Sequence, residues 1–294
     1  MMSTDRDNRL SLLMLTGAMV IFGTIGLFRR AIPLSSAMLA FLRGLIGAAF
    51  LLVIVIRRRR GIAAVRDRKL LTGLAVTGAM IGINWMLLFE AYNYTTVSVA
   101  TLCYYMQPVI VILLSPVFFG ERLTGKKLAC VVAAVLGMIL VSGVGSGQTG
   151  VKNLTGIACG LGAAALYAGV VMMNKKVSGV DAYEKTMIQL GAAAVIMVPY
   201  LLLTGRSVAE GTGFSAWVPV LVLIVGLFHT GIAYVLYFAS MDGLRTQTIA
   251  MLSYIDPVTA LFLSAVILHE GMTLRGLEGA LLILGAAFIS GRDA

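Results

Sequence analysis

Long apolar segments alternate with short polar connections along the whole chain. A helix needs about 20 apolar residues to cross the hydrocarbon core of a bilayer. Ten segments of the 294-residue sequence approach this length, and they lie near residues 10–28, 34–56, 70–92, 97–119, 127–144, 154–173, 185–204, 216–240, 247–268 and 274–290. Because the connections leave no room for a soluble domain, the pattern predicts an all-α membrane protein with ten transmembrane helices.

Composition agrees with a membrane protein. Apolar residues make up 59% of the sequence and charged residues 12%, and the mean hydropathy is +0.96. Soluble domains have about 45–50% apolar and about 25% charged residues. Cys103, Cys130 and Cys159 all lie in apolar segments, where a thiol behaves as a small hydrophobic side chain. An odd number of cysteines without a CxxC pattern predicts no disulfide framework, and we expect neither a metal site nor a cofactor.

The positive charges predict how the chain is oriented in the membrane. If the N-terminus is cytoplasmic, 17 of the 23 Lys and Arg residues lie in inner segments and five in outer ones. This bias places both termini in the cytoplasm. The net charge of +10 and the Arg57–Arg60 run could also indicate binding of nucleic acid or anionic lipid. We favour the topological explanation, and so expect the bilayer but no nucleic acid as a partner.

Two apolar segments are interrupted in the same way. Residues 102–113 read LCYYMQPVIVIL and residues 251–262 read MLSYIDPVTALF, which places Pro108 and Pro257 149 residues apart. At the same offset, GINWMLLFEAYNYT (82–95) lies over GIAYVLYFASMDGL (231–244). The chain is therefore predicted to consist of two five-helix repeats, 1–144 and 154–294, joined by an outer linker at 145–153. Since five is odd, the second repeat is inverted in the membrane, an architecture of secondary transporters.

The two prolines are expected to bend their helices near the middle of the membrane. Proline removes a backbone hydrogen bond and frees a carbonyl four residues earlier. In lipid, such groups must face protein or a water-filled cavity, so carbonyls near Tyr104 and Ser253 are predicted to point inward. The alternative is a packing kink that does not contact a substrate.

Four ionisable residues lie within apolar segments, where each charge costs roughly 2.5–3.5 kcal/mol. They are Arg43, Glu90, His229 and Asp256. Arg43 could attract a carboxylate, while Asp256 or Glu90 holds an ammonium or carries a coupling proton. Alternatively, Arg43 forms an internal ion pair with Asp256 or Glu90. Asp256 is the first candidate for coupling, because its repeat partner is the neutral Gln107. His229 is a second candidate, although a lone histidine on an apolar helix is more often a packing residue.

Aromatic and amide side chains gather in the repeated segments. The predicted substrate-binding residues are Asn84, Trp85, Tyr105, Gln107, Tyr234 and Tyr254, together with Arg43 and Glu90. A pocket with aromatic walls and few polar anchors suits a small amphipathic ligand. An interfacial aromatic belt is the alternative explanation, and we expect it to include Tyr92, Tyr94 and Trp217.

Two motifs suggest other chemistry, and we set both aside. GVGSGQTG (143–150) contains GxGxxG, but a phosphate-binding loop requires a preceding strand and a βαβ unit. His269-Glu270 lacks the second histidine of an HExxH zinc site, and Glu270 is explained by the repeat with Glu121. We therefore predict no catalytic residues. An intramembrane enzyme remains only a distant alternative.

Several motifs resemble those of the EamA type within the drug/metabolite transporter superfamily. They are GERLT (120–124), LGMILVSG (136–143), HEGMT (269–273) and LGAAFISG (284–291), together with the mid-helix prolines. The resemblance covers nearly the whole chain. It implies a bacterial inner-membrane protein that exports small metabolites through a central cavity lined by the third, fourth, eighth and ninth helices. It also implies a structural share for Arg43, since an arginine near this position is common in the family.

The sequence thus predicts a multi-pass secondary transporter that exports amino acids or similar small amphipathic metabolites by alternating access. Efflux of cationic drugs is the alternative. Coupling to protons and the oligomeric state remain open at this point.

Overall fold

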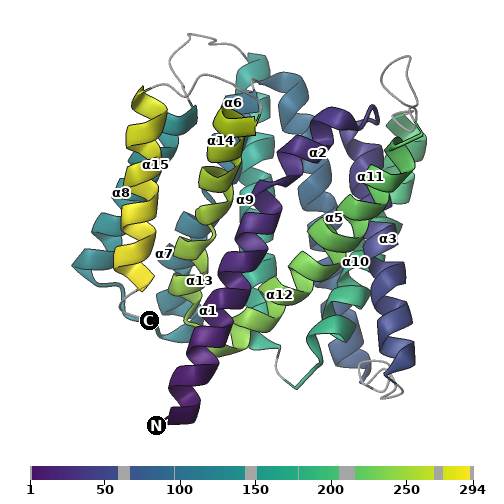
Figure 1. The fold of residues 1–294 in the computed structure, drawn as a ribbon, viewed down its shortest axis with the longest axis horizontal. Coiled ribbons are helices and arrows are strands. Elements are labelled where there is room, and N and C mark those ends of the chain that lie inside the picture. The colour runs from purple at the N-terminus through teal and green to yellow at the C-terminus, as the bar shows by residue number, and fades with distance from the viewer. Residues whose placement is uncertain are drawn as a thin grey trace.

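A computed structural model describes residues 2–58, 67–95, 97–142, 151–177, 179–204, 216–267 and 274–291, and helices dominate these ranges (Figure 1). The first half contains α1 (Met2–Gly23), α2 (Ile25–Ala31), α3 (Ser36–Arg57), α5 (Arg68–Tyr94), α6 (Val97–Tyr104), α7 (Gln107–Phe119) and α8 (Gly125–Ser142). The second half contains α9 (Val151–Lys176), α10 (Ala182–Thr204), α11 (Val218–Ile224), the π-helix η1 (Val225–Ile232), α12 (Ala233–Ser240), the short 3₁₀ turn η2 (Met241–Gly243), α13 (Thr246–Leu252), α14 (Ile255–Ile267) and α15 (Leu274–Gly291).

The helices confirm the multi-pass membrane class. Within the described residues, seven helical stretches are long and apolar enough to cross a bilayer: Asn8–Phe28, Ser36–Arg57, Arg68–Tyr94, Val99–Phe119, Leu154–Lys176, Ala182–Thr204 and Val218–Gly243. The other three predicted spans correspond to α8, to α13 with α14, and to α15. The count of ten membrane-crossing helices stays a prediction. Both chain ends lie on the same side of the bundle (Figure 1).

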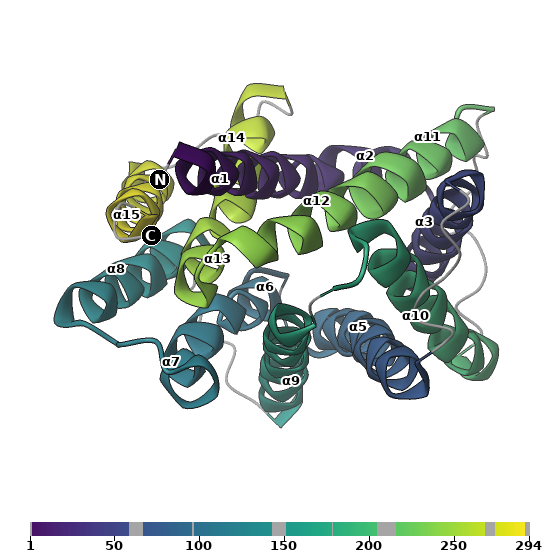
Figure 2. The same ribbon diagram turned by 90° about the horizontal axis from the view of Figure 1, so that it is seen from below.

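The helices are arranged around the middle of an elongated molecule. The α8–α15 pair forms one end, and α3 with α10 forms the other (Figures 1 and 2). Between them, the row formed by α1, α2, α11 and α12 faces a second row containing α5, α9, α6 and α7 (Figure 2). The main buried cluster draws residues from both rows, including Met19, Trp85, Tyr167 and Tyr237.

Contacts between helices follow a paired pattern. Helix α1 packs on α12, just as α9 packs on α5; α3 packs on η1, just as α10 packs on α5. Similarly, α1 packs on α14, and α9 packs on α6 and α7. The predicted repeat pairs α1 with α9, α3 with α10, α5 with the span that contains η1 and α12, and α6–α7 with α13–α14. Each contact in one half therefore has an equivalent contact in the other half. Three further close pairs, α3 with α10, α8 with α15 and α7 with α13, join repeat partners to one another.

Glycines permit the closest helix approaches. A Cβ added at Gly78 of α5 would lie 2.4 Å from the backbone oxygen of Gln189 on α10. At Gly226 of η1 it would lie 2.5 Å from Cγ2 of Ile46 on α3. Small residues at such crossings are typical of membrane helices, because association there depends on close backbone packing.

The two spans that carry the repeated prolines, Pro108 and Pro257, are interrupted rather than merely bent. Helix α6 ends at Tyr104 and α7 begins at Gln107, next to Pro108. Helix α13 ends at Leu252 and α14 begins at Ile255, shortly before Pro257. The prediction of a released carbonyl at Ser253 is wrong, because this oxygen accepts the Asp256 N–H at 3.3 Å in a tight turn.

Two further irregularities lie in spans where the sequence predicted continuous helices. The first span is broken at Thr24, between α1 and α2. The eighth contains the π-helix η1, a feature that often marks functional sites.

Candidate functional site

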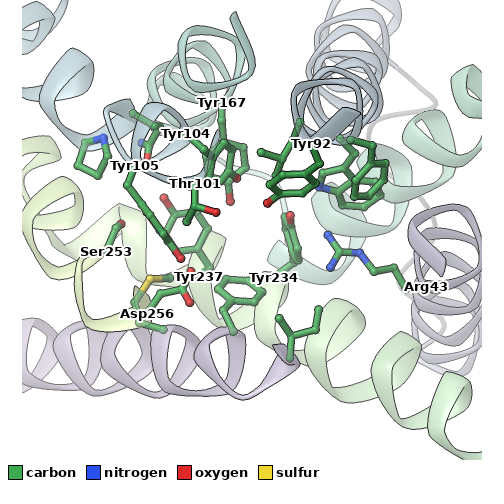
Figure 3. Close-up of a pocket in the computed structure, with 18 residues that line it drawn as sticks. Arg43, Tyr92, Thr101, Tyr104, Tyr105, Tyr167, Tyr234, Tyr237, Ser253 and Asp256 are labelled. Atoms are coloured by element: carbon green, nitrogen blue, oxygen red, sulfur yellow. The ribbon is translucent and has the colours of Figure 1, made fainter. Parts of the chain in front are cut away.

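A cavity of about 250 Å³ lies at the centre of the molecule, beside the α6–α7 break and the α13–α14 break (Figure 3). Both halves of the chain contribute to its wall. The lining residues are Met19, Phe22, Ile25, Arg43, Trp85, Leu88, Phe89, Tyr92, Thr101, Tyr104, Tyr105, Gln107, Pro108, Tyr167, Tyr234, Tyr237, Ser253 and Asp256.

Arg43 projects into the cavity from α3 (Figure 3). Its guanidinium carbon lies 4.3 Å from the ring centroid of Trp85, a cation–π geometry. Nε of Arg43 is buried and has no hydrogen-bond partner. Neither predicted ion pair is formed, and in the described part of the chain Arg43 has no carboxylate partner within 4.0 Å. The charge of Arg43 is therefore directed toward the cavity.

Asp256 enters the cavity from the first turn of α14, apart from Arg43 (Figure 3). The side chain of Tyr105, from the break between α6 and α7, points toward Asp256 across the cavity wall (Figure 3). The Tyr254 hydroxyl donates to the backbone oxygen of Tyr105 at 3.2 Å. Each helix break thus contacts the other across the two halves.

Gln107 occupies the position that corresponds to Asp256 in the first half. It is only 5% exposed, and its Nε2 has no hydrogen-bond partner. The two helix breaks therefore place different groups on the cavity wall, an amide and a carboxyl.

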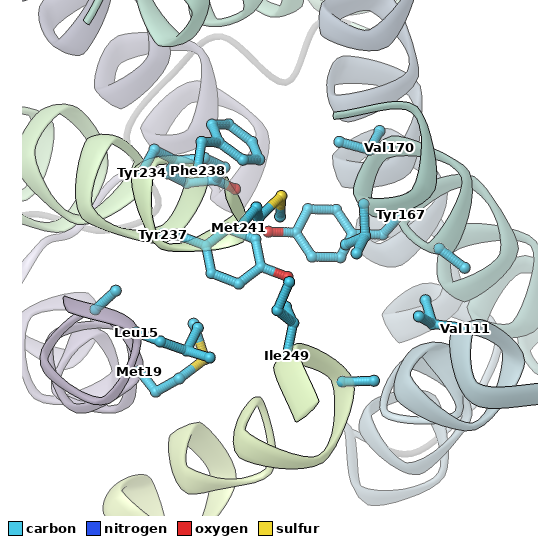
Figure 4. Close-up of a cluster of buried hydrophobic side chains, with 14 of the residues drawn as sticks. Leu15, Met19, Val111, Tyr167, Val170, Tyr234, Tyr237, Phe238, Met241 and Ile249 are labelled. Atoms are coloured by element: carbon cyan, nitrogen blue, oxygen red, sulfur yellow. The ribbon is translucent and has the colours of Figure 1, made fainter. Parts of the chain in front are cut away.

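Tyrosine rings form the wall between Arg43 and Asp256 (Figure 3). The rings of Tyr167 and Tyr237 lie nearly parallel, at 7° and with centroids 6.5 Å apart (Figure 4). The ring centroids of Phe22 and Tyr234 lie 5.1 Å apart in an edge-to-face arrangement. This wall offers flat apolar surface with hydroxyl groups at its edges.

Three predicted substrate-binding residues lie outside the cavity wall. Asn84 is fully buried and donates through Nδ2 to the Ala163 oxygen at 2.6 Å, which ties α5 to α9. The Glu90 carboxylate accepts from the Tyr200 hydroxyl at 2.6 Å. Tyr254 is 1% exposed and supports Tyr105 from behind.

His229 also lies outside the cavity. Its Nε2 is 2.7 Å from the Thr24 hydroxyl, and its ring centroid is 4.6 Å from that of Phe28. His229 thus joins η1 to the break between α1 and α2. Pro257 is likewise absent from the lining, whereas Pro108 belongs to it.

The structure brings further residues to the cavity. Tyr92, which the sequence places in the interfacial belt, lines the wall beside Thr101 instead. Phe22 and Tyr167 were not singled out as binding residues. However, FGTIGLFRR (22–30) and YAGVVMMNK (167–175) align near an offset of 145, which pairs these two residues. That weaker part of the repeat is the signal that could have found them.

The fold and the cavity define a class: a multi-pass helical membrane protein with a central cavity. Comparison with known proteins supplies the family. The sequence profile of the EamA-like transporter family matches residues 9–143 and 154–292. The chain therefore belongs to the EamA-like transporter family, and the resemblance seen in the sequence is confirmed.

Individual relatives agree with this assignment. The chain is 29% identical over 252 residues to the uncharacterized transporter YxxF of Bacillus subtilis, covering 85% of this chain and 79% of YxxF. It is 28% identical over 276 residues to an uncharacterized transporter of Archaeoglobus fulgidus, covering 93% of each chain. The protein RarD of Escherichia coli is 28% identical over 193 residues, covering 66% of this chain and 62% of RarD. A solved structure with a TM-score of 0.79 and 20% identity covers 97% of both chains and shows the same fold.

Proposed function

We propose that this transporter exports amino acids or similar small amphipathic metabolites from bacterial cells by alternating access. The observation that carries the proposal is the cavity where the two helix breaks meet. Its wall combines tyrosine rings with a cation at Arg43 and a carboxyl group at Asp256. Mostly apolar walls with a few placed polar groups are typical of small-molecule sites.

Two inverted five-helix repeats, 1–144 and 154–294, provide the mechanism. The two ranges matched by the family profile and the paired helix contacts support this division. In such transporters, the substrate lies near the repeat interface, and one bundle moves against the other around it. The breaks at Tyr105 and Ser253 are the proposed hinges, since they interrupt the helix hydrogen bonds beside the cavity.

Asp256 is the proposed coupling residue. A charge at this depth is costly, which makes an intramembrane carboxyl group a functional candidate. The Asp256 side chain lies at the cavity wall with Tyr105 pointing toward it (Figure 3), where a proton could be exchanged with the interior of the cavity. The neutral Gln107 in the other half restricts this role to one repeat.

Efflux of cationic drugs is the second candidate, because Asp256 and the tyrosine rings could also receive an ammonium group. The test is counterflow of a labelled amino-acid mixture in proteoliposomes, with and without an imposed pH gradient. We expect saturable exchange that the gradient accelerates. Exchange of cationic drugs but of no amino acid would reject the proposed cargo.

A further inference from the structure

The cavity contains two buried nitrogen donors that have no protein partner. They are Nε of Arg43 and Nε2 of Gln107. Arg43 reaches the cavity from α3 and Gln107 from α7, so the two donors come from different helices. Buried donors are nearly always paired in folded proteins, and an unpaired one carries a cost. In a binding site, they indicate that the ligand supplies acceptor atoms.

The charge of the cavity points in the same direction. Asp256 is the acidic residue among those that line the cavity, and it lies apart from Arg43 (Figure 3). Arg43 has no ion pair with the described residues and only stacks on Trp85. The positive charge on the Trp85 side of the cavity is therefore not neutralised by a carboxylate of the described residues. A guanidinium binds a carboxylate through two parallel hydrogen bonds, which suits it to this ligand group.

The surrounding walls suit the rest of such a ligand. Trp85 and Tyr234 lie beside Arg43, with their ring centroids 6.4 Å apart in an edge-to-face arrangement. Tyr104, Tyr167 and Tyr237 continue the aromatic surface toward Asp256 (Figure 3). A flat apolar body would lie along these rings with its acidic end at Arg43.

We propose that the cavity selects its cargo by a carboxylate group and does not require an ammonium group. The substrate class is small monocarboxylates with a flat apolar body, and amino acids are one subset of it. This inference deepens the proposed function and rests on it, because the same cavity is involved.

Trp85 provides a direct readout of binding. The chain has two tryptophans, and Trp217 is 71% exposed at the start of α11. Trp217→Phe therefore leaves Trp85, under the Arg43 guanidinium, as the single reporter of fluorescence. The probes are phenylpropionate, phenylalanine, phenylethylamine and phenylpropanol, which share a phenyl ring and differ in their charged groups.

Phenylpropionate and phenylalanine are expected to change Trp85 emission saturably, with dissociation constants within about tenfold of each other, since both present a carboxylate to Arg43. Phenylethylamine and phenylpropanol should bind at least about tenfold more weakly, because neither supplies a charged acceptor. Equal or tighter binding of phenylethylamine would overturn the proposal, and so would the lack of a saturable response to either carboxylate.

Two substitutions sharpen the test. Arg43→Gln should weaken carboxylate binding about tenfold or more, whereas Arg57→Gln, exposed at the end of the same helix, should leave it unchanged. Gln107→Glu should weaken carboxylate binding and strengthen phenylethylamine binding, a reversal that loss of folding does not produce. Carboxylate binding that survives Arg43→Gln unchanged contradicts the proposal.

Counterflow of labelled phenylpropionate in proteoliposomes separates this inference from the proposed function. Saturable binding without exchange would leave the carboxylate site standing and reject the carrier. Exchange of a cation combined with absent carboxylate binding would reject the site and retain the carrier.

Discussion

The hydroxyl group of Tyr254 donates a hydrogen bond to the backbone oxygen of Tyr105 at 3.2 Å, and the two residues are 149 positions apart in the chain. They occupy equivalent places in the two repeats predicted from the sequence. Their positions nevertheless differ, because Tyr254 is buried behind the break whereas Tyr105 lines the cavity and points toward Asp256 (Figure 3). The two halves thus share a backbone pattern and differ in chemistry at the site.

Asp256→Asn should retain counterflow and lose its acceleration by a pH gradient, since an amide cannot carry the proton. The measurement is the initial exchange rate in proteoliposomes with and without the gradient. Glu278→Gln, which alters an exposed residue of α15, is the matched control and should respond as the unchanged protein does. If Asp256→Asn still responded to the gradient, Asp256 would not be the coupling residue.

Tyr105→Phe should shift the pH at which transport is half-maximal, because the Asp256 carboxyl group loses the neighbouring polar hydroxyl that points toward it (Figure 3). The overall stability should change little, since the ring stays in place. Pairing the variant with Asp256→Asn isolates the interaction: in that background, Tyr105→Phe should have no further effect on the pH profile. An additional shift in the double variant would show that Tyr105 does not act on the pH profile through Asp256.

Gly78→Ala should lower the thermal midpoint, because its Cβ would lie 2.4 Å from the Gln189 oxygen across the α5–α10 contact. Overpacking of this kind costs about 1–3 kcal/mol. Gly73→Ala is the control on the same helix, since its Cβ would meet nothing within 4 Å. We expect Gly73→Ala to be neutral or slightly stabilising, and equal midpoints for the two variants would contradict the close contact.

Glu121→Gln should weaken the link between the end of α7 and the start of α13. The Glu121 carboxylate accepts the backbone N–H groups of Thr246 at 2.8 Å and Gln247 at 3.2 Å. A carboxylate at a helix N-terminus stabilises it, and its loss costs about 1 kcal/mol. The checks are the thermal midpoint and hydrogen exchange of residues 246–252. Unchanged protection of this segment would show that the contact does not hold α13 in place.

Pro108→Ala should slow transport, because restoring an N–H at this position favours one continuous helix through the break at Tyr105. Pro116→Ala in the same helix, outside the cavity lining, is the comparison and should have a smaller effect on counterflow. Equal rates for the two variants would argue against a hinge at Tyr105.

Features that depend on local composition and spacing could be predicted from the pattern of residues along the chain. Apolar length predicted a multi-pass membrane protein, and the repeated Tyr-x-x-Pro pattern located both helix interruptions beside the cavity. Arg43 and Asp256 could be recognised as candidate functional residues, because a charge inside an apolar segment is energetically costly. Both lie on the cavity wall.

Which face of each helix meets the cavity could not be predicted from the sequence, because it depends on how the helices pack. Asn84 and Trp85 are neighbours on α5, yet Asn84 bonds Ala163 of α9 while Trp85 lines the site. Tyr92 and Glu90 were likewise placed, in the interfacial belt and the binding site respectively, from their depth in the membrane alone. In the structure, the orientation of α5 directs Tyr92 into the cavity and Glu90 toward Tyr200. Successive helical residues point about 100° apart, so the packing of neighbouring helices determines which side chains face the site.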